Sequence, residues 1–99
     1  MSFRDVRDTP KESDMAQLIH STLLRLRQVL AETGDSRSWL YQRIADKQFT
    51  PPVKCGGISK WPAREVAAMN EAEIEGRTEA EKAQLVADLV SQRTAGKGQ

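Results

Sequence analysis

The sequence predicts a mainly α-helical fold: a winged helix-turn-helix with a small β-hairpin as its wing and further helices on the C-terminal side. Three observations predict it. A glycine and a serine with one residue between them (positions 34 and 36) can end one helix and begin the next, as a tight helix-turn-helix requires. A proline pair at 51–52 breaks the chain, and a glycine pair at 56–57 lets a hairpin turn back. The basic residues gather in this same part of the chain.

Length and composition limit the function classes. The 99 residues, 38% of them hydrophobic, allow one domain with a small core. No apolar run has the length of a membrane span, and the start lacks a signal-peptide pattern, so we expect no membrane partner. The single Cys55 cannot form an internal disulfide, which makes a reducing cytoplasm the expected location. His20 has no second ligand at metal-binding spacing, and we expect no metal, cofactor or small-molecule substrate.

The two ends of the chain are expected to lie outside the folded domain. Residues 1–20 are polar and alternate in charge, with a capping box that begins at Thr9, and are predicted to be a flexible or partly helical leader. Residues 94–99 are rich in glycine and are predicted to be a disordered tail. The winged helix-turn-helix with its C-terminal helices would then occupy residues 21–93.

The second helix of the turn, residues 37–46, is the predicted recognition helix. Leu40 and Ile44 are four residues apart and therefore share one face, which should contact the core. At 100° per residue, Ser38 and Gln42 lie nearly opposite that face. The preceding helix, residues 27–33, is expected to brace this one.

The charge distribution supports contact with phosphate. Residues 36–64 carry six cations and one anion, whereas residues 1–35 carry five and six and residues 65–99 carry four and seven. A basic middle segment of this kind attracts nucleic acid. Arginine suits guanine edges, glutamine suits adenine, and lysine suits backbone phosphate. The residues predicted to contact DNA are Ser36, Arg37, Ser38, Tyr41, Gln42 and Arg43 in the helix, and Lys54 and Lys60 in the hairpin.

The remaining elements are expected to support this surface. Phe49, Val53 and Trp61 should pin the hairpin (residues 53–61) to the core. Pro62 should open a helix that runs to residue 75, with its inner side formed by Ala63, Val66, Ala67 and Ile74.

A last helix follows the capping box Thr78-Glu79-Ala80-Glu81. Its apolar residues leave two interpretations open: they close the core, or some of them mediate self-association on DNA, because the stripe is wide for so small a protein. These residues are Leu85, Val86, Leu89 and Val90.

Two short motifs carry a family resemblance: T-G-x-S-R-S-x-L-Y at 33–41 and P-x-K-x-G-G at 52–57, followed by Lys60-Trp61. Over about residues 23–93 the chain resembles the AlpA-type family of prophage regulators, which is similar in fold to MerR-like winged helix-turn-helix domains and phage excisionases. The resemblance implies a short strand or lead-in over residues 21–26 and binding to double-stranded DNA on the bacterial nucleoid. The chain departs from the family pattern at Asp35, where the family usually has an apolar residue, and at Trp39, which replaces a small polar one.

The leading functional hypothesis is a sequence-specific, DNA-binding transcriptional regulator of phage or mobile-element type. It would place residues 36–46 in a major groove and its wing, residues 53–61, on the backbone. One alternative is an excisionase-like protein that bends DNA during recombination. An alternative of another class is a helical protein–protein interaction module. An enzyme is not expected, because the sequence has no glycine-rich phosphate loop and no arrangement of a catalytic triad or dyad.

Overall fold

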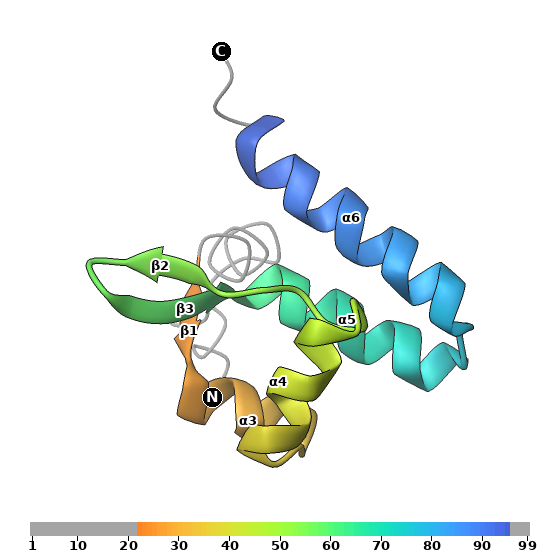
Figure 1. Ribbon diagram of the computed structural model, residues 1–99, viewed down its shortest axis with the longest axis horizontal. Helices are drawn as coiled ribbons and strands as arrows, with labels where there is room; N and C mark the ends of the chain where they lie inside the picture. The colour runs from red at the N-terminus through yellow and green to blue at the C-terminus, as the bar shows by residue number, and fades with distance from the viewer. Residues whose placement is uncertain (1–21, 96–99) are drawn as a thin grey trace, which may run out of the picture.

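The computed structural model describes residues 22–95, which form a three-stranded antiparallel sheet and four helices (Figure 1). The sheet has the strand order β1-β3-β2, and the β2–β3 hairpin projects away from the helices (Figure 1). In chain order the elements are β1 (Leu23–Arg25), α3 (Leu26–Thr33), α4 (Arg37–Ala45), β2 (Val53–Cys55), β3 (Ile58–Pro62), α5 (Ala63–Glu75) and α6 (Glu79–Ala95).

The predicted helix-turn-helix is confirmed, with α3 and α4 on either side of a tight turn. Gly34 adopts the left-handed conformation (φ 76°), and its N–H donates to the Leu30 carbonyl oxygen at 2.8 Å, which ends α3. Ser36 caps α4 because its Oγ accepts a hydrogen bond from the Trp39 N–H at 3.1 Å. The hairpin and the helix after it also form, with Pro62 at the end of β3 as the N-cap of α5 instead of its first residue.

The core lies between the helices and the base of the hairpin. Phe49 and Trp61 are fully buried, and the Trp61 Nε1–H donates to the Thr50 carbonyl oxygen at 3.0 Å. These contacts confirm that both aromatic residues pin the hairpin, whereas Val53 is only half-buried. The buried hydrophobic cluster consists of Val29, Leu40, Phe49, Trp61, Val66, Met69, Val86 and Leu89.

The predicted inner side of α5 is partly wrong. Val66 is buried, but Ala67 is exposed and Ile74 is 78% exposed, while Met69 faces the core. The reason is that a carboxylate, Glu65, occupies an inward position and is fully buried. A pattern based on apolar residues alone therefore placed the inner face at the wrong angle around the helix.

An ion pair holds the far end of α6 against the rest of the fold. The Arg93 Nε donates to Glu65 Oε2 at 2.8 Å, and its Nη2 also donates to the Pro51 carbonyl oxygen at 2.7 Å. Glu65 is fully buried, so its charge depends on this arginine for neutralisation. Helix α6 is thus anchored to both α5 and the segment ahead of β2.

The start and the apolar face of α6 follow the sequence pattern. Thr78 and Glu81 form the predicted capping box, with backbone-to-side-chain bonds of 2.9 and 3.1 Å. Val86 and Leu89 are buried in the intramolecular core, while Leu85 and Val90 pack against it half-buried. The core therefore covers more of this stripe than its small size suggested.

The predictions for the two ends of the chain can be compared with the structure only in part. The predicted capping box at Thr9 and the environment of His20 lie outside the described residues. Helix α6 continues to Ala95, two residues into the segment predicted to be a disordered tail. Within residues 22–95 no helix combines the length and the apolar character that crossing a membrane requires.

Candidate nucleic-acid interface

Helix α4 presents a polar face to solvent because Leu40 and Ile44, on its opposite face, are held against the core. Leu40 is fully buried and Ile44 packs against the core cluster, as predicted. Ser38 and Gln42, on the opposite side of the helix, are exposed. Nothing in the rest of residues 22–93 packs over this outer face closely enough to bury either side chain.

The N-terminus of α4 is suited to bind an anion. The Ser36 side chain satisfies the N–H group of Trp39, while the N–H groups of Arg37 and Ser38, in the first turn, have no partner within the helix. The Arg37 side chain is exposed beside them. Free backbone donors, the positive end of the helix dipole and a guanidinium therefore meet at one point, where a phosphate group would be stabilised.

Gln42 is exposed but already has an intrahelical partner. Its Nε2 donates to both oxygens of the Asp46 carboxylate, at 3.2 and 3.1 Å. A pair four residues apart on an exposed helix face contributes only about 0.2–0.5 kcal/mol. The amide can therefore leave Asp46 at small cost to reach a base edge.

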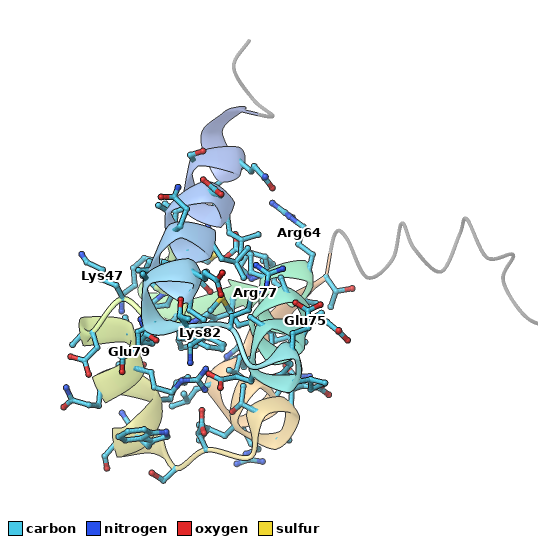
Figure 2. The ribbon with its side chains drawn as sticks, turned by 90° about the vertical axis from the view of Figure 1, so that its right-hand side faces the viewer. Lys47, Arg64, Glu75, Arg77, Glu79 and Lys82 are labelled. Atoms are coloured by element: carbon cyan, nitrogen blue, oxygen red, sulfur yellow. The ribbon has the colours of Figure 1, made fainter. Side chains whose placement is uncertain are left out.

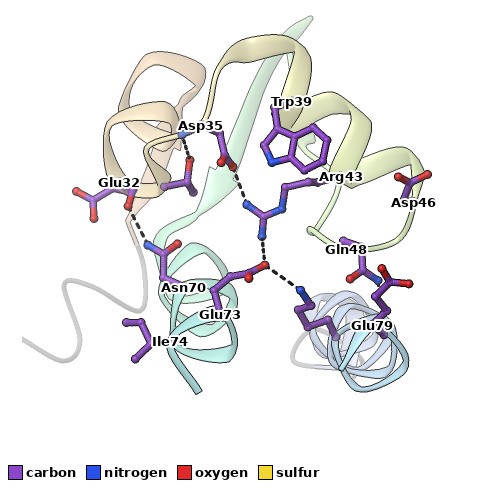
Figure 3. Close-up of a pocket in the computed structure, with 12 residues that line it drawn as sticks. Glu32, Asp35, Trp39, Arg43, Asp46, Gln48, Asn70, Glu73, Ile74 and Glu79 are labelled. Atoms are coloured by element: carbon purple, nitrogen blue, oxygen red, sulfur yellow. Dashed lines mark hydrogen bonds and ion pairs between the residues drawn. The ribbon is translucent and has the colours of Figure 1, made fainter. Parts of the chain in front are cut away.

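Arg43 differs most from its predicted role, because it lies inside the protein and not on the surface. It is 8% exposed, and its guanidinium donates to Asp35 Oδ2 at 2.6 Å and to Glu73 Oε2 at 2.8 Å (Figure 3). It also lies over the Phe49 ring, 5.1 Å from the ring centroid. Lys82 reaches the same Glu73 oxygen at 3.1 Å. Arg43 therefore clamps α4 to the turn and to α5, and is not free to contact DNA.

This buried network explains why an acidic residue is tolerated in the turn. Asp35 stands at the position where the resembled family usually has an apolar residue, and its side chain is only 14% exposed. The Arg43 guanidinium neutralises it there. The signal available in the sequence was the position of Arg43 three residues after Leu40, which places it toward the core side of the helix.

Tyr41 connects the recognition helix to the hairpin. Its ring meets the Trp61 ring edge-on, with centroids 6.4 Å apart and an interplanar angle of 65°. The side chain is 37% exposed, so part of it stays available at the surface. The contact joins α4 to β3 at the base of the hairpin.

The two hairpin lysines lie on opposite faces of the sheet. Lys54 pairs with Ser59 across the hairpin, and its Nζ donates to the Ser59 Oγ at 2.9 Å. Lys60 pairs instead with Val53 on one side and Arg25 on the other. Because side chains alternate along a strand, Lys54 shares its face with Trp61, the face toward α4, and Lys60 does not.

The cations of residues 36–64 do not form one continuous patch. Arg37, Lys47 and Lys54 are exposed and Lys60 is half-buried, while Arg43 is buried in the network described above. The structure joins the middle of α4 to β3 through the Tyr41–Trp61 contact, and it places Lys47 and Arg64 on different sides of the molecule (Figure 2).

Residues 22–75, which run from β1 to the end of α5, match the family model described as Prophage CP4-57 regulatory protein (AlpA). The match covers more than half of the chain and leaves out α6. No curated protein and no solved structure is significantly similar to the chain. In the part of the chain that the structure describes, no group of His, Cys, Asp and Glu side chains could hold a metal ion.

Proposed function

The chain belongs to the AlpA family of prophage regulatory proteins, a DNA-binding family, and from that premise we propose that it is a sequence-specific transcriptional regulator. In this proposal α4 enters the major groove of double-stranded DNA and the β2–β3 hairpin follows the backbone. A cytoplasmic location, on the bacterial nucleoid when bound, belongs to the same proposal.

The observation that carries the proposal is the exposed outer face of α4. Nine residues of helix extend about 14 Å, and the major groove is about 12 Å wide and open to a helix of this size. The buried Leu40 and the Arg43 network fix the helix on the opposite side, so its polar face is rigidly presented. A rigid helix that carries few exposed apolar groups on this face suits base readout.

The side chains divide into two roles. Gln42 would read a base edge, because its amide can form paired hydrogen bonds with adenine. Arg37 would bind a phosphate together with the free N–H groups of the first turn of α4. Ser36, Ser38 and Lys54 would position the protein on phosphates, which carry no sequence information. Tyr41, half-exposed beside the hairpin, would add a backbone contact from its free edge.

Arg43 and Lys60 enter the proposal differently from the other predicted contacts. Arg43 is a positioning residue, since it acts on DNA only by orienting α4. Lys60, on the far face of the hairpin, would contribute only long-range attraction.

Transcriptional control and excisionase-like DNA bending would use the same contacts, and the location of the binding sites separates them. Pairing of two copies on DNA through α6 remains a further proposal, which rests on the half-buried Leu85 and Val90. Changing Val90 to Lys tests it. Loss of cooperative binding to a full site, with half-site binding and circular dichroism unchanged, supports pairing; unchanged cooperativity contradicts it.

The function is tested by retention of sheared genomic DNA on the immobilised protein, followed by sequencing. The proposal predicts a few enriched sites that share a motif, and their loss with the Arg37→Ala/Lys54→Ala double variant. Enrichment in promoters supports a regulator, and clusters in a recombination arm support an excisionase. Retention without any shared motif, or equal retention by the double variant, contradicts sequence-specific binding through α4.

A further inference from the structure

A cleft of about 640 Å³ opens on the side of the molecule where α3, α4, α5 and α6 converge (Figure 3). It lies along the flank of α4 that carries Trp39, Arg43 and Asp46, next to the outer face proposed to meet DNA. Five carboxylates and two cations line it. The carboxylates are Glu32, Asp35, Asp46, Glu73 and Glu79, and the cations are Arg43 and Lys82.

The cations of the cleft are already committed to ion pairs. Arg43 pairs with Asp35 and Glu73, and Lys82 pairs with Glu73. The other three carboxylates, Glu32, Asp46 and Glu79, form no ion pair with any side chain of residues 22–93. The cleft therefore carries an excess negative charge that the fold itself does not neutralise.

Two large apolar side chains that line the same cleft are exposed to solvent. Trp39 is 56% exposed and Ile74 is 78% exposed, the two highest values among the exposed large hydrophobic residues of the described chain. They come from different helices, α4 and α5, and lie at different edges of the cleft (Figure 3). Exposed tryptophan beside charged groups is typical of binding hot spots and also attracts cations through its ring face.

The charge of the cleft decides between classes of ligand. Phosphate-rich nucleic acid would be repelled by three unpaired carboxylates, so the cleft does not extend the DNA-binding face. A ligand that complements it must carry positive charge together with apolar groups. Its position on the flank of α4 leaves it open while the outer face of that helix is occupied.

We propose that this cleft docks a cationic peptide segment of a protein partner. The apolar side chains of the segment pack on Trp39 and Ile74, and its lysine and arginine side chains face Glu32, Asp46 and Glu79. The docking does not depend on DNA binding, and it gives a DNA-bound protein a second surface that recruits another protein.

The test uses a short synthetic peptide of lysine and arginine residues around leucine, titrated into the full chain. The fluorescence of Trp39 reports binding, because the only other tryptophan, Trp61, is fully buried. The proposal predicts a saturable change that a peptide with glutamate in place of the basic residues does not produce. Absence of saturation with the basic peptide overturns the proposal.

Matched variants assign the binding to the cleft. Ile74→Ser should weaken binding of the peptide about tenfold, because it removes most of the apolar contact that Ile74 offers; tenfold corresponds to about 1.4 kcal/mol. Glu32→Gln combined with Glu79→Gln should weaken it by a similar factor. Glu71→Gln, which removes an exposed carboxylate of α5 outside the cleft, should leave it unchanged. Equal effects from all three would mean non-specific attraction and would overturn the proposal.

Titrations with DNA distinguish the cleft from the proposed DNA-binding face. Ile74→Ser should leave affinity for an enriched genomic fragment unchanged, and Lys54→Ala should leave affinity for the peptide unchanged. A preformed DNA complex should still bind the peptide. Competition between DNA and peptide for the protein would show that the cleft is not an independent site.

Discussion

Replacing Arg43 with Met should destabilise the protein strongly, although the residue was expected on the surface. The guanidinium neutralises Asp35, whose side chain is 14% exposed, and Glu73, whose side chain is 42% exposed. Methionine keeps much of the volume and the contact with Phe49 but removes the charge. The variant therefore isolates the electrostatic role of the arginine.

The expected loss follows from the burial of each partner. Removing one member of a buried ion pair costs about 3–5 kcal/mol, because the remaining charge stays buried without compensation. Glu73 keeps Lys82 at 3.1 Å and is partly hydrated, so Asp35 is the main uncompensated charge. We therefore expect the lower end, about 3 kcal/mol, which corresponds to a fall of more than about 10 °C in the melting temperature of a domain this small.

Urea denaturation followed by circular dichroism measures this loss, with two reference variants. Arg77→Met breaks an exposed pair with Glu75 and should cost less than about 1 kcal/mol. Asp35→Leu combined with Arg43→Met removes both charges and should recover about 2 kcal/mol of the loss, since an apolar plug can replace a buried pair. A loss of unfolding free energy for Arg43→Met as small as that for Arg77→Met, or no recovery in the double variant, would refute the stabilising role of the Arg43 ion pairs.

Three further predictions concern single contacts. Lys54→Ala should weaken binding to all DNA sequences alike, and more than Lys60→Ala does, because Lys54 lies on the hairpin face that is turned toward α4. Fluorescence anisotropy measures the affinity of both variants for specific and scrambled duplexes. Gln42→Ala should instead reduce discrimination at one base pair by about 1–3 kcal/mol, measured on a set of single-base variants of the site; a sequence-independent loss would contradict base readout. Arg93→Met should cost about 3 kcal/mol in urea denaturation, because it leaves the fully buried Glu65 unpaired; a loss below about 1 kcal/mol would mean that this pair does not anchor α6.

Local signals predicted most of the architecture. A helix that ends at Gly34 and another that begins at Ser36 depend on backbone conformation and one side-chain bond, both of which are properties of a few neighbouring residues. The capping box at Thr78 is of the same kind. Such features are visible in a sequence because the residues that interact are adjacent in it.

Interactions between distant residues were not predictable in the same way. Arg43 has two partners, and one of them, Glu73, is 30 residues away. Glu65 and Arg93 are 28 residues apart. A charged residue on a helix is expected to face water unless its partner is known, so neither buried ion pair was predicted. Because the burial of Glu65 was not predicted, the inner face of α5 was also placed wrongly.

The most direct test of DNA binding through α4 and the hairpin is the salt dependence of affinity for an enriched genomic fragment. If Arg37, Lys54 and their neighbours neutralise about four phosphates, the logarithm of the association constant should fall with the logarithm of salt concentration at a slope near −3.6. The Arg37→Ala/Lys54→Ala variant should give a slope shallower by about two. A flat titration of the unmodified protein over the same salt range would contradict a DNA-binding function.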